Sequence, residues 1–251
     1  MNAWDLVLAH RYSDALAVYD RNLNQAGNDY VEVSNRATAL LCLGRLREAL
    51  GGFERADALM RARPGLYSDG YLIASGITHW LLRERTAAVE SFRKAVDGIL
   101  HRKIKYSDNA GGATPGLLLW YAGCTIRDSS ILNYSIEYLT GLSEKPRIRS
   151  WPGHLAMYVT GQTGLVDVLK AATGVDDLEH CIVLAADNLA KRRMLAPALF
   201  YRAVKSRAEG DEMGCLTWMR ACSQLENPIL EGEWYLATSE VKTSDSDDTG
   251  H

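Results

Sequence analysis

Small and aromatic side chains recur at helical steps through the first half of the chain. In the segment 45–56, RLREALGGFERA, the small Ala49 is followed by the aromatic Phe53 four positions later and by the small Ala56 three positions after that. Residues three and four apart lie on one face of a helix, and small residues on that face let two helix backbones approach closely. The segment therefore predicts a helix that packs tightly against a neighbour, with the aromatic ring filling the remaining space.

A partner helix precedes this segment. Ala37 and Leu40 lie twelve and nine positions before Ala49, and Gly44 stands where the chain must turn. These positions predict a helical hairpin, which is two helices joined by a short turn. An earlier copy precedes this one by 34 positions, and a third copy follows it by 39. The other copies contain Ala3, Leu6, Ala15 and Tyr19; Gly76, Ala88, Phe92 and Ala95; and, near the end of the chain, Ala203, Gly210, Cys215, Met219 and Cys222.

These spacings resemble the tetratricopeptide repeat (TPR), a helix–turn–helix of 34 residues that includes an alanine, an aromatic residue four positions later and a terminal proline. The early tryptophan and the leucine–glycine pair of that motif are missing here, Asn22 replaces a small apolar residue, and Pro64 falls late. The resemblance implies an all-α protein, an α-solenoid of degenerate TPR-like hairpins with about 13–14 helices. It also implies that the first helix of each hairpin lines a concave groove.

The pattern divides the chain into four predicted parts. They are three TPR-like hairpins at 1–102, divergent helical hairpins with long loops at 103–194, a last TPR-like hairpin with a capping helix at 195–241, and a disordered acidic tail at 242–251. Glycine and proline interrupt the middle part at 107–116 and 143–153, where loops are expected. The tail has nothing apolar to bury. Helices are expected in the middle part at Leu117–Ile126, Ile131–Leu142, Leu155–Gln162, Leu165–Ala172 and Leu178–Leu189.

Composition narrows the class of protein. Apolar residues make up 47% of the 251 residues, and no apolar run approaches the roughly 20 residues that span a bilayer. The N-terminal sequence MNAWDLVLAH resembles no signal peptide, so a cytoplasmic location is expected. Five scattered cysteines favour buried thiols over a disulfide framework. A net charge of −3 argues against general nucleic-acid binding, and an RNA-binding repeat would need basic residues that recur on the groove face.

Several motifs suggest chemistry but have simpler interpretations. Tyr-Ser-Asp occurs at 12–14, 67–69 and 106–108, and Ser and Asp are preferred helix caps. Cys215 and Cys222 lack the closely spaced partner that a thiolate metal site needs. His180–Cys181 has no evident third partner with which to form a catalytic site. The glycine-rich segment 109–116 matches no phosphate-binding fingerprint. The basic stretches 92–106 and 191–193 fit solvated helix ends. The sequence therefore predicts no catalytic residue, no metal site and no cofactor.

Helical phase assigns seven residues to the groove. These are Ser34, Thr38, Leu41, Ile73, Ile77, Trp80 and Leu81. The set is largely apolar and lacks the Lys, Asn and Arg with which some TPR proteins hold a chaperone's terminal carboxylate. It is either a docking groove for a partner segment or an internal surface covered by the chain's own middle part.

Protein recognition without catalysis is the predicted function. The chain would bind one cognate protein or peptide segment, as an adaptor, a chaperone-like holder or a bacterial immunity protein that blocks a toxin; fold-level analogy carries much of this prediction. The alternative is an enzyme or ligand-binding regulator with a pocket formed by loops 103–116 and 143–153. That pocket would contain Trp120, Tyr121, Arg147, Trp151 and His154. The oligomeric state is left open.

Overall fold

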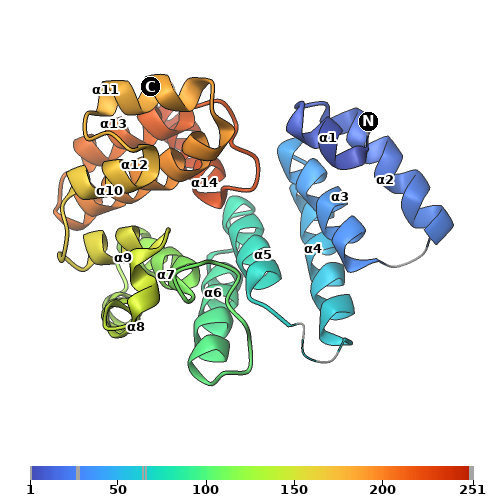
Figure 1. Cartoon of the computed structure of the whole chain (residues 1–251), viewed down its shortest axis with the longest axis horizontal. Helices are drawn as coiled ribbons and strands as arrows, with labels where there is room; N and C mark the ends of the chain where they lie inside the picture. Colours follow the sequence, from blue (N-terminus) through green and yellow to red (C-terminus); the bar gives the residue numbers. More distant parts are fainter. Residues whose placement is uncertain (1, 27–28, 64, 66, 249–251) are drawn as a thin grey trace. The chain divides into compact units, whose positions relative to one another are not determined.

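The computed structural model describes residues 2–26, 29–63, 65 and 67–248. These residues form α-helices α1 to α14 and one short 3-10 helix, and their single β feature is an isolated bridge between Ser68 and Lys105. The prediction of an all-α protein is therefore confirmed. The chain divides into two compact units, Met1–Ser107 and Asp108–His251, which are described separately below (Figure 1).

The first unit is a run of helices in which each helix packs against the next along the chain. Its elements are α1 (Ala3–Leu8), α2 (Tyr12–Ala26), α3 (Tyr30–Cys42), α4 (Leu46–Arg61), α5 (Gly70–Leu81) and α6 (Arg85–Leu100). The repeated alanines Ala15, Ala49 and Ala88 are completely buried, on α2, α4 and α6. The predicted packing face is therefore the buried face of the second helix in each hairpin.

Close packing explains why the third hairpin has Gly76 at the repeat position where the second hairpin has Ala37. A Cβ atom added at Gly76 would lie 2.4 Å from Cε1 of Phe92, and the Phe92 side chain is completely buried. In the preceding hairpin, a Cβ added at Gly52 would lie 2.7 Å from the Cβ of Ala37. Missing side-chain atoms therefore let α5 approach α6, and α3 approach α4, as the spacing predicts.

The repeat also extends to the backbone of the turns. His10, Gly44, Arg83 and Gly210 all have left-handed backbone conformations, with φ of 58°, 73°, 64° and 84°. In each turn the N–H of this residue donates to the carbonyl three positions earlier, and the next N–H donates to a carbonyl five positions before itself. The first three turn residues have the same 34- and 39-residue offsets as the packing residues. The hairpins thus share a turn geometry as well as a side-chain pattern.

We expect Arg83→Gly to raise the free energy of unfolding by about 0.5–1 kcal/mol, because the left-handed conformation is strained for residues with a Cβ and relaxed for glycine. The opposite substitution in the equivalent turn, Gly44→Ala, should lower the free energy of unfolding by about 1 kcal/mol. Urea unfolding of both variants beside the parent protein measures the two changes. A loss of stability in Arg83→Gly would show that contacts of the arginine outweigh the backbone strain.

Two loops of the first unit are joined by backbone pairing around Asp69. The Asp69 N–H donates to the Lys105 carbonyl, and the Lys105 N–H donates to the Tyr67 carbonyl, both at 3.0 Å. The buried Asp69 carboxylate accepts from the Ser107 N–H at 2.6 Å. The expected capping role is thus wrong for Asp69, whose side chain makes no cap bond at the start of α5.

The second unit is built around α12. Its elements are α7 (Ala113–Ile126), α8 (Ser129–Ser143), a 3-10 helix (Pro146–Arg149), α9 (Gly153–Val159), α10 (Leu165–Thr173), α11 (Leu178–Ala186), α12 (Leu189–Ala208), α13 (Glu212–Ser223) and α14 (Gly232–Asp248). Helix α12 packs against α7, α9, α10, α11, α13 and α14, and all residues from 195 to 201 are buried. The apolar stretch 195–201 of α12, bounded by basic residues on both sides, therefore lies in the centre of this core.

Asp108 supports the start of this unit. Its carboxylate accepts hydrogen bonds from the N–H groups of Ala110, Gly112 and Thr114 at 2.8–2.9 Å. Helix α7 begins at Ala113, so part of the predicted 107–116 loop is helical. Pro115 fits in this first turn because its missing N–H would have no helical partner there. At the third Tyr-Ser-Asp site, Asp108 thus accepts from an N–H in the first turn of α7, although the N-cap residue of this helix is Gly112.

The predicted disordered tail is wrong up to residue 248. Helix α14 continues through 242–248 to Asp248, and Arg220 on α13 pairs with Asp245 at 2.9 Å. Once the apolar start of α14 is anchored, each added residue extends an existing helix, which is much easier than nucleating one. Residues 249–251 lie outside the described residues.

Two further sequence expectations concern cysteines and membranes. None of the five cysteines forms a disulfide; Cys124, Cys181, Cys215 and Cys222 are buried, as expected, whereas Cys42 is partly exposed. Within the described ranges, no helix combines the length and the apolar character that crossing a membrane requires.

Candidate functional site

The predicted groove residues differ in exposure. Thr38, Ile77 and Trp80 are buried, with 6%, 5% and 2% of their surface exposed. The guanidinium of Arg85 covers the Trp80 ring at 3.9 Å from the ring centroid. The side chains of these three residues are therefore largely covered by the chain's own residues. The other four, Ser34, Leu41, Ile73 and Leu81, are partly exposed.

The five residues of the alternative pocket also have different surroundings. Trp120 and Tyr121 on α7 are buried, and the Tyr121 ring packs edge-on against Phe200 at 4.9 Å. They are core residues of the second unit, which corrects their assignment to a pocket wall. Arg147 is exposed, and Trp151 is partly buried.

His154 is the fifth of these residues and is partly buried. Its Nδ1 is buried and has no hydrogen-bond partner among the described residues. Burial lowers the pKa of His154, although the Asp167 carboxylate acts in the opposite direction. The imidazole is therefore neutral at pH 7. Of the two loops proposed for this pocket, residues 103–107 belong to the first unit, whereas 108–116 and 143–153 belong to the second.

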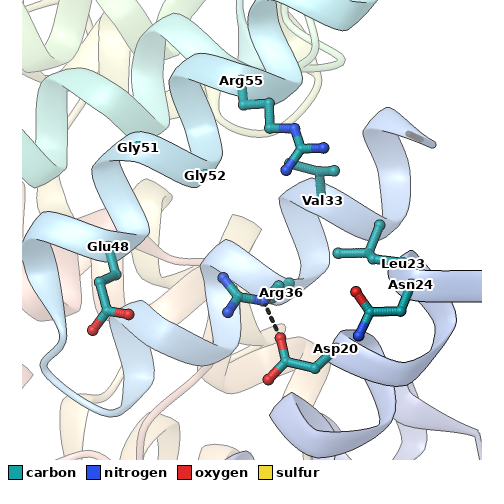
Figure 2. A pocket seen from close by; sticks show the side chains of 9 residues that line it. All are labelled: Asp20, Leu23, Asn24, Val33, Arg36, Glu48, Gly51, Gly52 and Arg55. Atoms are coloured by element: carbon teal, nitrogen blue, oxygen red, sulfur yellow. Dashed lines mark hydrogen bonds and ion pairs between the residues drawn. The ribbon is translucent and has the colours of Figure 1, made fainter. Parts of the chain in front are cut away.

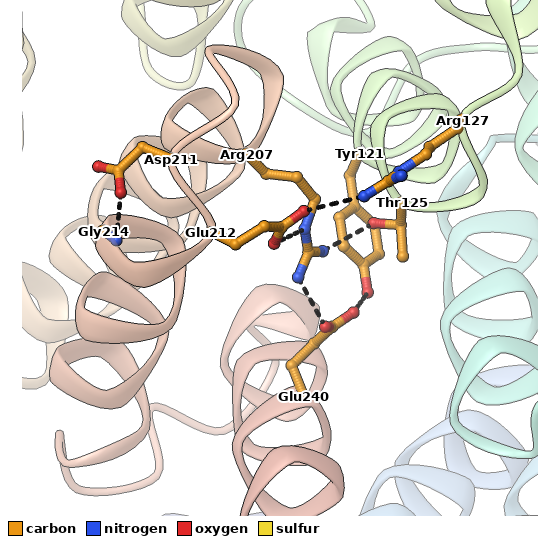
Figure 3. A network of polar contacts seen from close by, with 8 residues as sticks. All are labelled: Tyr121, Thr125, Arg127, Arg207, Asp211, Glu212, Gly214 and Glu240. Atoms are coloured by element: carbon orange, nitrogen blue, oxygen red, sulfur yellow. Dashed lines mark hydrogen bonds and ion pairs between the residues drawn. The ribbon is translucent and has the colours of Figure 1, made fainter.

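A polar network links four helices of the second unit (Figure 3). Arg207 on α12 donates to Glu240 on α14, to Glu212 on α13 and to Thr125 on α7, each at 3.1 Å. Tyr121 on α7 donates to the other oxygen of Glu240 at 2.7 Å. Burial alone would lower the pKa of Arg207, but the Glu240 carboxylate raises it above its ordinary value. Arg207 and Tyr121 donate these bonds to acceptors within the second unit, so the network holds the four helices together.

A second group of ionisable side chains lies where α13 leads into α14. Glu233 is buried and accepts a hydrogen bond from the Tyr201 hydroxyl at 3.2 Å. Burial, followed by the charge of Glu233, raises the pKa of the partly buried Glu231 to about 8, while Arg193 opposes the shift. The pKa of Glu233 is also raised by burial. These groups make the stability of the second unit depend on pH.

We expect the free energy of unfolding to fall by about 2–4 kcal/mol through Glu231 between pH 5 and pH 8. Between the ordinary value of 4.5 and the raised pKa of about 8, the folded protein keeps a proton that the unfolded chain releases. Stability must therefore decrease as pH rises through this window. Glu231→Gln should flatten the dependence in urea unfolding at several pH values. The same change at the exposed Glu137 should leave the slope unchanged, and a slope retained in Glu231→Gln would contradict this assignment.

An open pocket of about 610 Å³ lies between α2, α3 and α4 of the first unit (Figure 2). Its lining combines apolar side chains with charged groups on three helices. The lining residues are Asp20, Leu23, Asn24, Val33, Arg36, Glu48, Gly51, Gly52 and Arg55. Gly51 on α4 leaves space beside the pocket, since no heavy atom lies within 4 Å of a Cβ added there, whereas a Cβ at Gly52 would meet the Cβ of Ala37.

The two carboxylates of the pocket are held by arginines. Arg36 Nε donates to Asp20 Oδ1 at 2.6 Å. Arg45 donates to both oxygens of Glu48, at 2.7 and 2.6 Å, and this hydrogen bond lowers the pKa of Glu48. Glu48 is therefore ionised at pH 7. The guanidinium of Arg55 lies on the opposite side of the pocket, beside Val33 (Figure 2).

The pocket lies on a different face of α3 from the predicted groove. Val33 and Arg36 point to it, whereas Ser34 and Leu41 lie on the other side of the helix by their spacing. The repeat pattern gave no indication of the pocket, because in that pattern small residues account only for helix packing. The signal was the glycine pair 51–52 in the middle of a helix, where glycine is unfavourable by about 1 kcal/mol relative to alanine.

The two glycines should respond in opposite ways to alanine. Gly51→Ala should raise the free energy of unfolding by about 0.5–1 kcal/mol, because the added methyl group meets open space and alanine favours the helix. Gly52→Ala should lower it by about 1–2 kcal/mol, because the new Cβ would lie 2.7 Å from the Cβ of Ala37. Urea unfolding of the two variants measures both effects. Equal changes at both positions would contradict the packing described here.

The chemistry that this pocket offers is recognition by charge and hydrogen bonds. Its lining presents guanidinium donors, carboxylate and amide acceptors, and the apolar surface of Leu23 and Val33. Among the described residues, no group of three or more His, Cys, Asp or Glu side chains is placed to hold a metal ion. Comparison of this chain with models of protein families, with curated proteins and with solved structures finds no match.

Proposed function

We propose that this protein binds a segment of one partner protein, and that the pocket between α2, α3 and α4 is the recognition site. The observation that carries the proposal is the pocket itself, whose lining combines apolar side chains with charged groups on three helices. A volume of about 610 Å³ suits a few residues of an extended or helical segment.

A repeat architecture supports this proposal. The recurring left-handed turns and buried alanines fit degenerate TPR-like hairpins arranged as a short α-solenoid. Repeat arrays of this kind present extended surfaces to other macromolecules. The pocket lies between the second helix of the first hairpin and both helices of the next. A bound segment would therefore contact two successive repeats at once.

Affinity capture with a filled-pocket variant tests the proposal. Gly51→Leu adds a side chain at the pocket lining, at a position where nothing lies within 4 Å of the added Cβ. Gly141→Leu on α8 is a matched control, since Gly141 is also an exposed helix glycine with open space around its Cβ. Circular dichroism and urea unfolding first establish that both variants fold like the parent.

The three proteins are then immobilised and exposed to lysate of the source organism. A protein that binds the parent and Gly141→Leu stoichiometrically should bind Gly51→Leu at least about tenfold more weakly in calorimetry, which corresponds to about 1.4 kcal/mol. Equal binding to all three proteins, or the absence of any stoichiometric partner, would overturn the proposal. The identity of the partner would then separate the roles of adaptor, chaperone-like holder and neutralising protein.

A further inference from the structure

The loop that follows α6 carries only basic charges. Residues 84–97, from the N-cap of α6 onwards, contain three acidic and three basic side chains and are therefore balanced. Residues 98–107 contain no acid and three cations, Arg102, Lys103 and Lys105, and all three residues are exposed. We call residues 101–106 the basic loop. Because every Lys, Arg, Asp and Glu in both ranges is counted, the excess of positive charge does not depend on which side chains form ion pairs.

The end of α6 does not account for these cations. Basic side chains stabilise a helix when they lie in its last turn, where they compensate the negative end of the helix dipole, and the effect falls off beyond that turn. The last turn of α6 contains no basic residue, and the three cations follow its C-cap residue, His101. The expected role of this stretch as a solvated helix end therefore does not explain why three cations gather in the loop.

Two sets of contacts fix the basic loop on the first unit. Ile104 packs against Gly98 of α6, where an added Cβ would lie 2.2 Å from Cδ1 of Ile104. The Lys105 N–H donates to the Tyr67 carbonyl at 3.0 Å, and the Lys105 ammonium donates to the Gly65 carbonyl at 2.6 Å. The cations are thus presented by a loop with a defined backbone. Such a loop loses little conformational freedom when a partner binds to it.

Two carboxylates lie beside the basic loop, and backbone N–H groups bind both. Asp69, in the loop paired with Lys105, is completely buried and accepts from the Ser107 N–H at 2.6 Å. Asp108 follows Ser107 in the chain, is partly buried, and accepts from three N–H groups at the start of α7. Neither carboxylate is exposed, so a partner that approaches the basic loop meets the three exposed cations.

The number of cations and their surroundings indicate the class of partner. The rest of the chain carries an excess of six negative charges, since the whole chain has a net charge of −3. Three cations would neutralise only about three phosphates, and a long nucleic acid would also meet this negative remainder. Stable attachment to a membrane needs a second signal besides a few cations. A short acidic protein segment needs only the loop itself, and Leu100, which is 51% exposed at the end of α6, offers it an apolar contact.

We propose that the basic loop is a docking surface for an acidic segment of a partner protein, with carboxylates beside Arg102, Lys103 and Lys105 and an apolar side chain against Leu100. None of these residues lines the pocket between α2, α3 and α4, so the inference does not depend on the proposed function. Hydrogen bonds between charged groups are stronger than neutral ones. Because the cations are exposed, each contributes modestly, and binding should weaken as salt is added.

Nuclear magnetic resonance titration of the full chain tests this inference. The probes are two acetylated peptides of five residues, one with four glutamates around a central leucine and one with glutamines in their place. The glutamate peptide should shift the amide signals of residues 100–105, with a dissociation constant about fivefold lower than that of the glutamine peptide at low salt. The double variant Arg102→Gln/Lys103→Gln should lose this preference.

A matched control removes two exposed cations elsewhere. Lys145→Gln/Arg149→Gln changes the net charge of the chain by the same amount, at the 3-10 helix of the second unit. This variant should keep the preference for the glutamate peptide. An equal loss in both double variants would show that the peptide responds to the net charge of the chain, which would overturn a specific surface.

The remaining outcomes also contradict the inference. Equal affinity for the two peptides, or no shift at residues 100–105 up to about 10 mM peptide, would show that the basic loop does not recognise acidic segments. Tighter binding of a short oligothymidine than of the glutamate peptide would identify a nucleic-acid surface instead. Sedimentation with vesicles of about one-third phosphatidylserine that is lost in Arg102→Gln/Lys103→Gln would identify a membrane surface.

Discussion

Replacing Trp80 by alanine should lower the free energy of unfolding by about 3–5 kcal/mol. The side chain is only 2% exposed, and the Arg85 guanidinium lies over its ring. Truncation would remove a large buried apolar surface and leave a cavity that rigid helices cannot fully close. Urea unfolding followed by far-ultraviolet circular dichroism measures the change.

Trp218→Ala provides a control with the same chemical change at a less buried position. Trp218 is partly exposed, with Arg202 at 5.6 Å from its ring centroid, so the loss should be about 1–2 kcal/mol. A Trp80→Ala protein within about 1 kcal/mol of the parent that binds its partner more weakly would instead show that Trp80 is a surface contact. The docking groove would then be the better description of this face.

Trp80 also shows which part of the fold can be predicted from sequence. The offsets of four and three positions around Ala49 are set by the geometry of a single helix, so they are visible without knowing any tertiary structure. The same holds for the turns, where Gly44 marks a left-handed residue and His10 and Arg83 occupy equivalent positions. Whether a given apolar face is exposed depends on what packs over it, and helical phase contains no such information.

The candidate pocket illustrates a second limit. Its walls come from three helices, and the ion pair between Asp20 and Arg36 joins residues 16 positions apart. No local spacing rule connects such residues. The glycine pair at 51–52 could have indicated a special site from the sequence alone, because two adjacent glycines destabilise a helix interior unless the structure requires them. Gly52 has a packing reason, whereas the open space around Gly51 belongs to the pocket.

Replacing Arg207 by methionine should lower the free energy of unfolding by about 3–4 kcal/mol. The two side chains of the pair with Glu240 are only 16% and 19% exposed, so the variant would leave a largely buried carboxylate with the Tyr121 hydroxyl as its remaining bond within this network. The bonds to Thr125 and Glu212 would be lost as well. Methionine keeps most of the side-chain volume, so the loss reports mainly on charge and hydrogen bonding.

The exposed ion pair between Arg220 and Asp245 is the matched control, since it also links α14 to a neighbouring helix but has side chains that are 43% and 57% exposed. Arg220→Met should therefore change the free energy of unfolding by less than about 1 kcal/mol. If the unpaired carboxylate causes most of the loss in Arg207→Met, then adding Glu240→Leu should recover part of it, about 1–2 kcal/mol, because the buried charge is removed with its partner. If the double variant is as unstable as Arg207→Met, then the hydrogen bonds of Arg207 to α7 and α13 hold these helices together. Neutralising the charge of Glu240 would then contribute little. Urea unfolding of the parent, Arg207→Met, Glu240→Leu and the double variant decides between the two causes, because only the first makes the two substitutions non-additive.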